Sequence, residues 1–394
     1  MHVLIVPSWY RASKTDTQGS FFREQALALL KHGHQVGIIH PQHRSMRQWQ
    51  TTFSGKYGFS LENDCGIPTL RMHTMTWFPR QIPWLNYLLW VRNGLTLYRR
   101  YVERYGQPDI VHAHGMIYGG LLGWKIKSRY RVPFVVTEHG TAYARKLVTP
   151  WQIKLATKAA TQADCRLAVS EAFCNELAVF IGSHWQPCAN VVSSMFTNYP
   201  LAESQSDCQK FTFVSVAYLT ERKNMHLLIT AFAQAFKNDV GVCLKIGGDG
   251  KERQRLELLA QELNVDDRII FLGALERDEV RNAIATADSF VLASQYETFG
   301  VVVIEALALG KPVIVTRCGG PNLVVTKQDG LLVPPGDINA MAEAMQKLRR
   351  GSKYYDAQSI RDGCVSRFGE AAIAQRLSEI YQNVRVQSQM KRSL

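Results

Sequence analysis

The chain lacks long hydrophobic runs and paired cysteine motifs. In its 394 residues no charge-free stretch of eighteen apolar residues occurs, which argues against a membrane-spanning helix. The eight cysteines include no C-x-x-C pair, so the pattern favours neither a zinc ribbon nor a disulfide framework. The opening MHVLIVPSWY has no basic region before its apolar run and no small-residue cleavage site after it, and it predicts a first strand rather than a signal peptide. We therefore expect a cytoplasmic protein.

Positive charge is concentrated in the first half. Residues 1–200 carry 22 Lys and Arg against 10 Asp and Glu, a net charge of +12, whereas residues 201–394 carry 24 against 23, a net charge of +1. No recognised nucleic-acid motif or repeated stacking platform accompanies this charge, so we expect no nucleic-acid partner. The asymmetry indicates that the first half meets an anionic substrate or surface.

Two α/β domains are expected from the length and from alternating strand and helix patterns. HVLIVP, FFREQALALLKHG and VGIIH form a predicted β-α-β unit, and DIVHAHG, PFVVTEHG and CRLAVSE continue the series, each ending in a polar tip. A polar segment at 198–210 is the expected linker, after which a second series begins at FTFVSVAYL. We place the domains at 1–200 and 201–394, with the alternative that the terminal helix packs back on the first domain.

One segment concentrates the candidate chemistry. Residues 294–312 read SQYETFGVVVIEALALGKP, which follows a predicted strand and predicts a helix from near Gly300 to Gly310. Unpaired N–H groups at such a helix start can hold phosphate oxygens without a metal. Glu297 would lie on the loop beside the ligand, and Glu305, one to two turns into the helix, could accept hydrogen bonds from a ribose diol.

The two glutamates, within S-x-x-E-x-F-G-x-x-x-x-E-A-x-A-x-G-x-P-V, resemble the signature of family 4 retaining glycosyltransferases. The resemblance extends to QGSFFREQA around Gly19, to HAHG at 112–115, to VAYLTERKN at 216–224, to GGDG at 247–250 and to FLGAL at 271–275. It implies an α/β protein of the GT-B fold, in which two Rossmann-like domains with parallel sheets face each other across a deep cleft. The nucleotide-sugar donor would lie mainly against the second domain, and the first would bind the acceptor.

The resemblance also implies residue roles. Glu297 and His114 would be the catalytic pair, with Glu297 on the transferred sugar and His114 reaching one of its hydroxyls. Donor binding is implied for a larger set: Gly19, Arg222, Lys223, Gly273, Leu275, Phe299, Gly300, Val301 and Glu305. Within this set Lys223 would neutralise the diphosphate, and the loop from Gly273 to Leu275 would meet the base through its backbone.

Two positions depart from the family pattern. Tyr218 replaces the arginine that the family usually has in its G-R-L turn, and Ser194-Met-Phe-Thr197 replaces the usual N-x-x-D turn. Either Arg222 supplies the missing charge, or Tyr218 takes over the position without it.

Two further features keep alternatives open. His112 and His114 lie two apart on a predicted strand and could face one side as a metal pair, but no acidic or Cys partner lies nearby in sequence. The basic, aromatic stretch from Trp77 to Tyr105 is either an amphipathic helix packed on its own sheet or an interfacial face near acidic lipid head groups, with Arg92, Arg99, Arg100 and Arg104 toward the lipid.

The functional expectation is a retaining glycosyltransferase of the hexosyltransferase class. It would use a nucleotide diphosphate sugar, UDP-linked in preference to GDP-linked, and a saccharide or lipid-linked acceptor, in bacterial cell-envelope polysaccharide synthesis. It would need no metal or other cofactor, and it would act in the cytoplasm, with peripheral binding to the inner membrane face as an added expectation. The alternatives are a nucleotide-sugar epimerase and a non-catalytic nucleotide-sugar-binding protein.

Overall fold

The computed structural model describes residues 1–11, 19–44, 57–76, 83–143, 145, 147–201 and 210–393. Contacts divide the chain into two units, each of which is described by itself. Unit 1 comprises Met1–Val191 and Ile373–Leu394, and unit 2 comprises Val192–Ala372. Among the described helices none combines the length and the hydropathy that a bilayer crossing requires.

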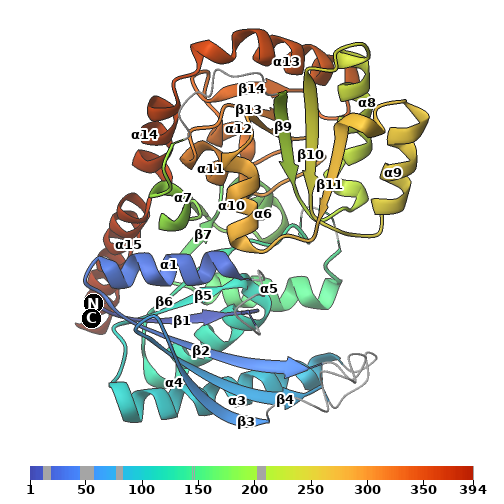
Figure 1. The fold of residues 1–394 in the computed structure, drawn as a ribbon. Coiled ribbons are helices and arrows are strands. Elements are labelled where there is room, and N and C mark those ends of the chain that lie inside the picture. The colour runs from blue at the N-terminus through green and yellow to red at the C-terminus, as the bar shows by residue number, and fades with distance from the viewer. Residues whose placement is uncertain are drawn as a thin grey trace. The chain divides into compact units, whose positions relative to one another are not determined.

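Unit 1 contains one mixed sheet with the strand order β3-β4-β2-β1-β5-β6-β7-β8. The apolar runs of the sequence form its central strands, and helix α1 covers one face while α3 and α4 cover the other (Figure 1). Its strands are β1 His2–Pro7, β2 Gln35–Arg44, β3 Gly58–Asp64, β4 Ile67–Met75, β5 Ile110–His114, β6 Phe134–Glu138, β7 Cys165–Ala168 and β8 Gln186–Pro187. Its helices are α1 Ser20–Lys31, α3 Pro83–Tyr105, the π-helical turn η2 Gly115–Gly120, α4 Leu121–Tyr130, α5 Pro150–Gln162, α6 Glu171–Ile181 and most of α15 Glu370–Ser393.

One strand of unit 1 departs from the expected parallel arrangement. β3 pairs antiparallel with β4 through a turn in which Cys65 has φ 54° and Gly66 has φ 91°. Two successive residues with positive φ are typical of the tight turns that join antiparallel strands, so the chain reverses here without a crossover helix.

Unit 2 contains a parallel sheet with the order β11-β10-β9-β12-β13-β14. Its strands are β9 Phe211–Val216, β10 Val242–Gly247, β11 Ile269–Gly273, β12 Ser289–Leu292, β13 Val313–Thr316 and β14 Gly330–Val333. Its helices are α7 Ser194–Thr197, η3 Glu221–Lys223, α8 Met225–Phe236, α9 Arg253–Glu262, η4 Asp266–Arg268, α10 Arg277–Ala285, α11 Val301–Ala308, α12 Pro321–Val324, α13 Ile338–Gly351, η5 Ser352–Tyr354 and α14 Ala357–Phe368.

The unit boundary differs from the one expected at residue 200. Val192 N–H donates to the carbonyl of Phe368 at 2.8 Å, which ties residues after 191 to unit 2. At the other end of the chain, Leu377 and Tyr381 of α15 are buried in the unit 1 core, so this terminal helix completes the first unit. Much of the expected linker, residues 202–209, lies outside the described residues.

Candidate functional site

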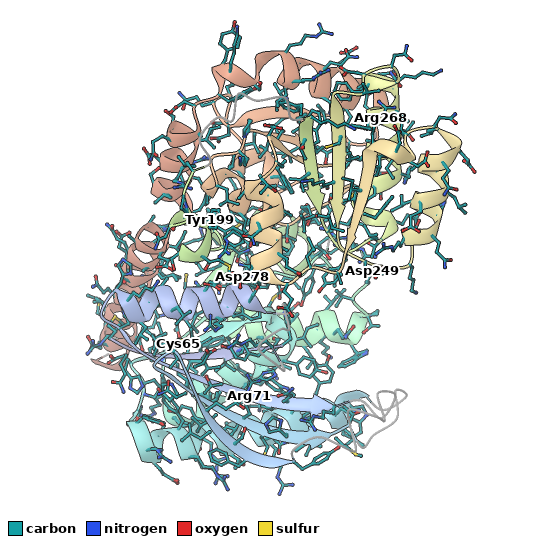
Figure 2. All side chains as sticks on the ribbon, in the orientation of Figure 1. Cys65, Arg71, Tyr199, Asp249, Arg268 and Asp278 are labelled. Carbon is teal, nitrogen blue, oxygen red and sulfur yellow. The ribbon has the colours of Figure 1, made fainter. Side chains whose placement is uncertain are left out.

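The carboxyl ends of the unit 2 strands carry most of the candidate residues. The sheet order reverses between β9 and β12, and in parallel α/β sheets ligands bind beside such a switch point. Figure 2 labels Asp249, in the turn after β10, and Asp278, in the first turn of α10, at this edge of the sheet. The loops after β9, β12 and β13 meet here through backbone hydrogen bonds, since Gln295 N–H donates to the carbonyl of Arg222 at 2.9 Å and Glu297 N–H to that of Cys318 at 2.8 Å.

Glu297 lies at the centre of this meeting point. Its side chain is buried, and its Oε1 accepts hydrogen bonds from Lys223 Nζ at 2.5 Å and from Ser294 Oγ at 2.8 Å. Arg222 Nη1 lies 3.4 Å from Oε2 and donates to the carbonyl of Tyr296 at 2.8 Å. The structure thus brings the sequence-predicted Glu297 together with Lys223 and Arg222, which lie 74 and 75 residues before it in the chain.

The charge of this cluster is unbalanced. Burial alone would raise the pKa of Glu297, but the charges of Lys223 and Arg222 and the hydrogen bonds from Lys223 and Ser294 hold it below its ordinary value. The carboxylate is therefore ionised at neutral pH. Two cations against one carboxylate leave one positive charge, which suits an anionic ligand.

Helix α11 begins where the sequence predicts, one residue after Gly300. Gly300 precedes it with φ 86° and ψ 59°, a left-handed conformation that favours glycine. The N–H groups of Gly300, Val301 and Val302 come before the first intrahelical bond, which Val303 N–H makes to the carbonyl of Gly300 at 2.9 Å. The ring of Phe299 is buried against Phe368 and fixes the approach to the helix.

Glu305 is buried on α11 and forms an ion pair with Arg277, the first residue of α10. The guanidinium of Arg277 also lies 4.9 Å above the ring of Phe196. The sequence analysis missed Arg277. Its position just after the FLGAL segment, at the start of a helix, was the available signal. Any hydroxyl pair that binds Glu305 would meet a carboxylate already oriented by this arginine.

Glycines bring the turns after β10 and β11 close to their neighbours. A Cβ on Gly248 would lie 1.9 Å from the carbonyl oxygen of Ala217, so no side chain fits there. Gly273 has φ 75°, and its carbonyl accepts from Gly248 N–H at 2.7 Å. Leu275 packs on Gly247, where an added Cβ would lie 2.6 Å from Leu275 Cδ1. Gly273 and Leu275 therefore lie at the same sheet edge as Glu297.

The two departures from the family pattern take different places. Tyr218 is 65% exposed, whereas Arg222 contacts Glu297 directly. The positive charge at this edge thus comes from Arg222 and Lys223. The segment Ser194–Thr197 forms helix α7, and its buried Phe196 supplies the ring beneath Arg277.

Unit 1 carries a second cluster at the end of β5. His114 is fully buried and its Nδ1 lies 3.0 Å from Nε2 of His139, while the rings of His112 and Phe22 lie 4.2 and 4.7 Å from its own. Burial, with the neighbouring histidines, lowers the pKa of His114 well below its ordinary value, so the imidazole is neutral. Nε2 of His114 has no partner among the described residues and is the ring atom left for a ligand.

The contacts of His112 argue against a metal site formed by His112 and His114. Its Nδ1 lies 2.6 Å from the Tyr381 hydroxyl and its Nε2 lies 2.7 Å from Oγ1 of Thr137. Both ring nitrogens are therefore occupied within unit 1. His112 anchors the terminal helix to the sheet rather than pointing with His114 to a common ligand.

Sequence reasoning also missed Glu138, at the end of β6. This buried carboxylate accepts hydrogen bonds from the N–H groups of Met116 at 2.8 Å, His139 at 2.9 Å and Gly140 at 2.8 Å. Burial raises the pKa of Glu138, and these three N–H donors oppose that rise. The polar tip TEHG was the available signal. Glu138 fixes the backbone after two neighbouring strands.

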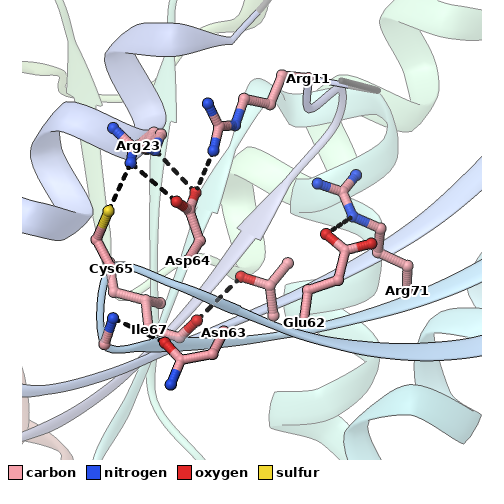
Figure 3. A network of polar contacts seen from close by, with 10 residues as sticks. Arg11, Arg23, Glu62, Asn63, Asp64, Cys65, Ile67 and Arg71 are labelled. Carbon is pink, nitrogen blue, oxygen red and sulfur yellow. Dashed lines mark hydrogen bonds and ion pairs between the residues drawn. The ribbon is translucent and has the colours of Figure 1, made fainter. Parts of the chain in front are cut away.

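Gly19 lies immediately before α1, with φ 72°. Figure 3 shows that Asp64 binds two arginines that flank residues 12–18: Arg11 Nη2 donates to Asp64 Oδ2 at 2.8 Å, and Arg23 donates to both oxygens at 2.8 Å. Burial alone would raise the pKa of Asp64, but these arginines hold it below its ordinary value. Asp64, the last residue of β3, thus holds Arg11 before Gly19 and Arg23 of α1 after it.

The basic stretch predicted from Trp77 forms helix α3 from Pro83, and residues 77–82 lie outside the described residues. Trp90, Leu97 and Tyr101 are buried on its inner side. The four arginines of the helix, Arg92, Arg99, Arg100 and Arg104, are exposed. The helix therefore packs on its own sheet and also presents a basic face.

Comparisons with known proteins agree with this arrangement. A family model described as glycosyl transferases group 1 matches residues 201–360, and one described as glycosyltransferase family 4 matches residues 18–189. The chain is 38% identical over 136 residues to a lipopolysaccharide core biosynthesis glycosyltransferase, LpsE, of Rhizobium meliloti. That alignment covers 34% of this chain and 38% of LpsE.

Solved structures match nearly the whole chain. A sucrose-phosphate synthase from Thermosynechococcus elongatus has a TM-score of 0.78 at 22% identity and covers 98% of this chain and 99% of its own. HepE of Anabaena in complex with UDP has a TM-score of 0.72 at 19% identity, with 97% and 100% covered, and was also solved with UDP-glucose. The expected fold, two Rossmann-like α/β domains, is confirmed.

Proposed function

The chain belongs to the family 4 glycosyltransferases of the GT-B fold, and from this premise we propose that it transfers a hexose from a nucleotide diphosphate sugar with retention of configuration. A UDP-sugar is the favoured donor and a GDP-sugar the alternative. HepE, which binds UDP, supports the first choice. The acceptor is a saccharide or a lipid-linked saccharide of bacterial cell-envelope polysaccharide synthesis, which the name of the rhizobial relative supports.

The cluster of Glu297, Lys223 and Arg222 is the observation that carries this proposal. A diphosphate brings about two negative charges, and the cluster has one positive charge in excess. The early N–H groups of α11 and the helix dipole add further stabilisation of anionic oxygens. Because these groups are held in place before the ligand arrives, they can stabilise the leaving diphosphate without reorganisation. Transfer is proposed to need no metal.

Glu297 acts on the sugar as an ionised hydrogen-bond acceptor. Its lowered pKa means that it does not donate a proton at neutral pH. In the proposed same-face reaction, the acceptor oxygen forms a bond to the anomeric carbon as the bond to the diphosphate breaks, and a phosphate oxygen takes the acceptor proton. Glu297 then orients and stabilises the sugar without forming a bond to it.

Glu305 is proposed to bind the ribose. Its carboxylate is buried and oriented by Arg277, and charge-assisted hydrogen bonds from two hydroxyls would be stronger than neutral ones. Gly273 and Leu275 meet the base through the backbone, at the same edge of the sheet. Gly300 and Val301 face the phosphates, with Phe299 fixing the turn.

Unit 1 is proposed to bind the acceptor. Its neutral His114 offers Nε2 to a hydroxyl of the transferred sugar, as donor or acceptor according to its tautomer. Gly19 is proposed to let the donor approach the backbone closely. The basic charge of residues 1–200 supports binding to the anionic surface of the inner membrane from the cytoplasmic side.

The test is the stereochemistry of transfer under chelation. Full-length protein, excess chelator, a saccharide acceptor and either UDP-hexose or GDP-hexose are incubated, and the anomeric proton coupling of the product is read by NMR. We expect a product with the configuration of the donor. An inverted product, loss of activity on chelation, or conversion of the donor without release of nucleoside diphosphate would each contradict the proposal.

A further inference from the structure

A groove of about 450 Å³ runs along the surface of unit 1 between α3 and α4. On the α3 side it is lined by Leu88, Val91, Arg92, Leu95 and Arg99, at helical spacings of three and four residues. Residues at these spacings share one face of a helix. The groove is therefore a continuous stripe of α3 and not a gap at a loop.

The groove follows from close contact of the two helices. A Cβ on Gly94 would lie 2.2 Å from Cδ2 of Leu122, so glycine is what lets α3 approach α4 here. On α4, Lys125 and Arg129 lie about one and two turns beyond Leu122 and line the other wall. The groove is therefore lined by apolar side chains of α3 and by long basic side chains of both helices.

Four cations line the groove: Arg92, Arg99, Lys125 and Arg129. All four are exposed, and no carboxylate among the described residues forms an ion pair with any of them. An exposed arginine of unit 2 does have such a partner, because Arg255 Nη1 lies 3.5 Å from Glu252 Oε2. Four positive charges of the first half, none of them paired with a described carboxylate, thus lie together in this groove.

Apolar side chains continue the same stripe toward the start of α3. Leu88 is 59% exposed, and Trp84, one turn earlier, is 53% exposed. A stripe that changes from aromatic and aliphatic to cationic along one helix face matches a ligand with an apolar and an anionic part. A free sugar or a nucleic acid would leave the apolar end uncovered.

We propose that this groove docks the phosphate headgroups of an anionic lipid bilayer, with Trp84 and Leu88 toward the acyl boundary. The proposal deepens the membrane-surface part of the proposed function and rests on it. In this proposal the membrane binds at a defined site, and not only through the general positive charge of the first domain. Phosphate oxygens accept hydrogen bonds from Arg92, Arg99, Lys125 and Arg129, and the apolar end adds contact area that salt does not screen.

The experiment compares two pairs of arginines on the same helix. The full chain is sedimented with vesicles of phosphatidylcholine alone or with added phosphatidylglycerol. Arg92→Gln with Arg99→Gln removes two groove charges. The matched control, Arg100→Gln with Arg104→Gln, removes two exposed charges of α3 outside the groove. A basic side chain near an anionic surface contributes about fivefold to binding, so we expect about a 25-fold loss for the groove pair and less than about twofold for the control.

Each outcome decides the proposal. Equal losses for both pairs, or no preference of the wild type for anionic vesicles, would overturn it. Displacement by inorganic phosphate beyond that caused by chloride at the same ionic strength would assign a soluble phosphate ligand instead of a bilayer and would also overturn it. Release of nucleoside diphosphate from the donor is also measured without vesicles for all variants. If the wild type released none, the result would contradict the proposed function and not the groove.

Discussion

The two units place their candidate residues at equivalent points of similar sheets, but those of unit 2 are charged and those of unit 1 are neutral. Unit 2 places ionised pairs, Glu297 with Lys223 and Glu305 with Arg277, at its strand ends. Unit 1 places neutral imidazoles there, with His114 against His139. Charged groups fixed in a buried setting suit a diphosphate, and neutral groups suit hydroxyls. One kind of fold thus provides two chemistries through the residues after its strands.

Histidine content extends this comparison to the whole of each unit. Ten of the eleven histidines precede residue 192, and His226 alone lies in unit 2, where it is exposed. Burial lowers the pKa of His40, of His112 and of His139 to about 3. The units should therefore respond differently to acid.

The largest expected effect is that acid unfolds unit 1 before unit 2. Between pH 6.5 and 3 these three histidines bind protons in the unfolded chain but stay neutral in the folded unit, so the stability of unit 1 falls as pH falls. At pH 5.5 each histidine lowers the free energy of unfolding by about 1.4 kcal/mol, and the three together lower it by about 4 kcal/mol. Glu138, whose pKa is raised, opposes this as one group. In unit 2 the lowered pKa of Glu297 contributes stability that is fully present above its ordinary pKa of 4.5 and is lost only as pH falls below that value.

Fluorescence separates the two events, because all eight tryptophans belong to unit 1. We expect the tryptophan signal to change at a higher pH than the later part of the far-UV circular dichroism signal. His226→Gln is the control and should shift neither transition. Coincident transitions by both probes would contradict the comparison.

The next effect concerns nucleotide binding in unit 2. Glu305→Ala removes the proposed ribose acceptor and leaves Arg277 without its carboxylate, and hydrogen bonds to charged groups contribute about 1.5–3 kcal/mol. We expect calorimetry to give a Kd for UDP that is at least about tenfold higher, and we expect the stability of unit 1 to be unchanged. Glu262→Ala, an exposed glutamate of α9, is the control. Unchanged UDP affinity in Glu305→Ala would remove the ribose assignment.

The smallest effect sharpens the role of the α11 helix start. Gly300 and Gly336 both have a left-handed conformation, with φ of 86° and 80°. A Cβ added at Gly300 would lie 3.0 Å from Cγ of Pro321, whereas one added at Gly336 would have no atom within 4 Å. Both alanine variants should lose about 1 kcal/mol of stability in urea unfolding. UDP binding should weaken for Gly300→Ala and stay unchanged for Gly336→Ala. Equal binding by both variants would argue against phosphate contact at Gly300.

Local patterns were enough to predict much of this structure. The strand ends at His114 and the helix start after Gly300 were predictable because apolar runs, glycine and helix periodicity act within a few residues. The clustering of Glu297 with Lys223 followed from the family motifs, which identify residues that sequence distance separates.

Long-range partners were not predictable in the same way. Arg277 pairs with Glu305, and Tyr381 with His112 across 269 residues, through tertiary packing that leaves no periodic signal. The three N–H groups on Glu138 belong to backbone geometry that composition does not encode. The β3–β4 hairpin was missed although its turn contains Asn, Asp and Gly, because Cys65 occupies a positive-φ position where Asn or Gly is usual.

The central claim is that Glu297, set among fixed cations in unit 2, stabilises sugar transfer from a nucleotide diphosphate donor. Its most direct test is the rate of nucleoside diphosphate release from UDP-hexose with acceptor in excess chelator, for wild type, Glu297→Gln and the exposed control Glu262→Gln. Loss of one preorganised electrostatic contact costs about 10²–10³-fold in kcat, so we expect that loss for Glu297→Gln and wild-type rates for the control. Equal rates for all three proteins would contradict the account.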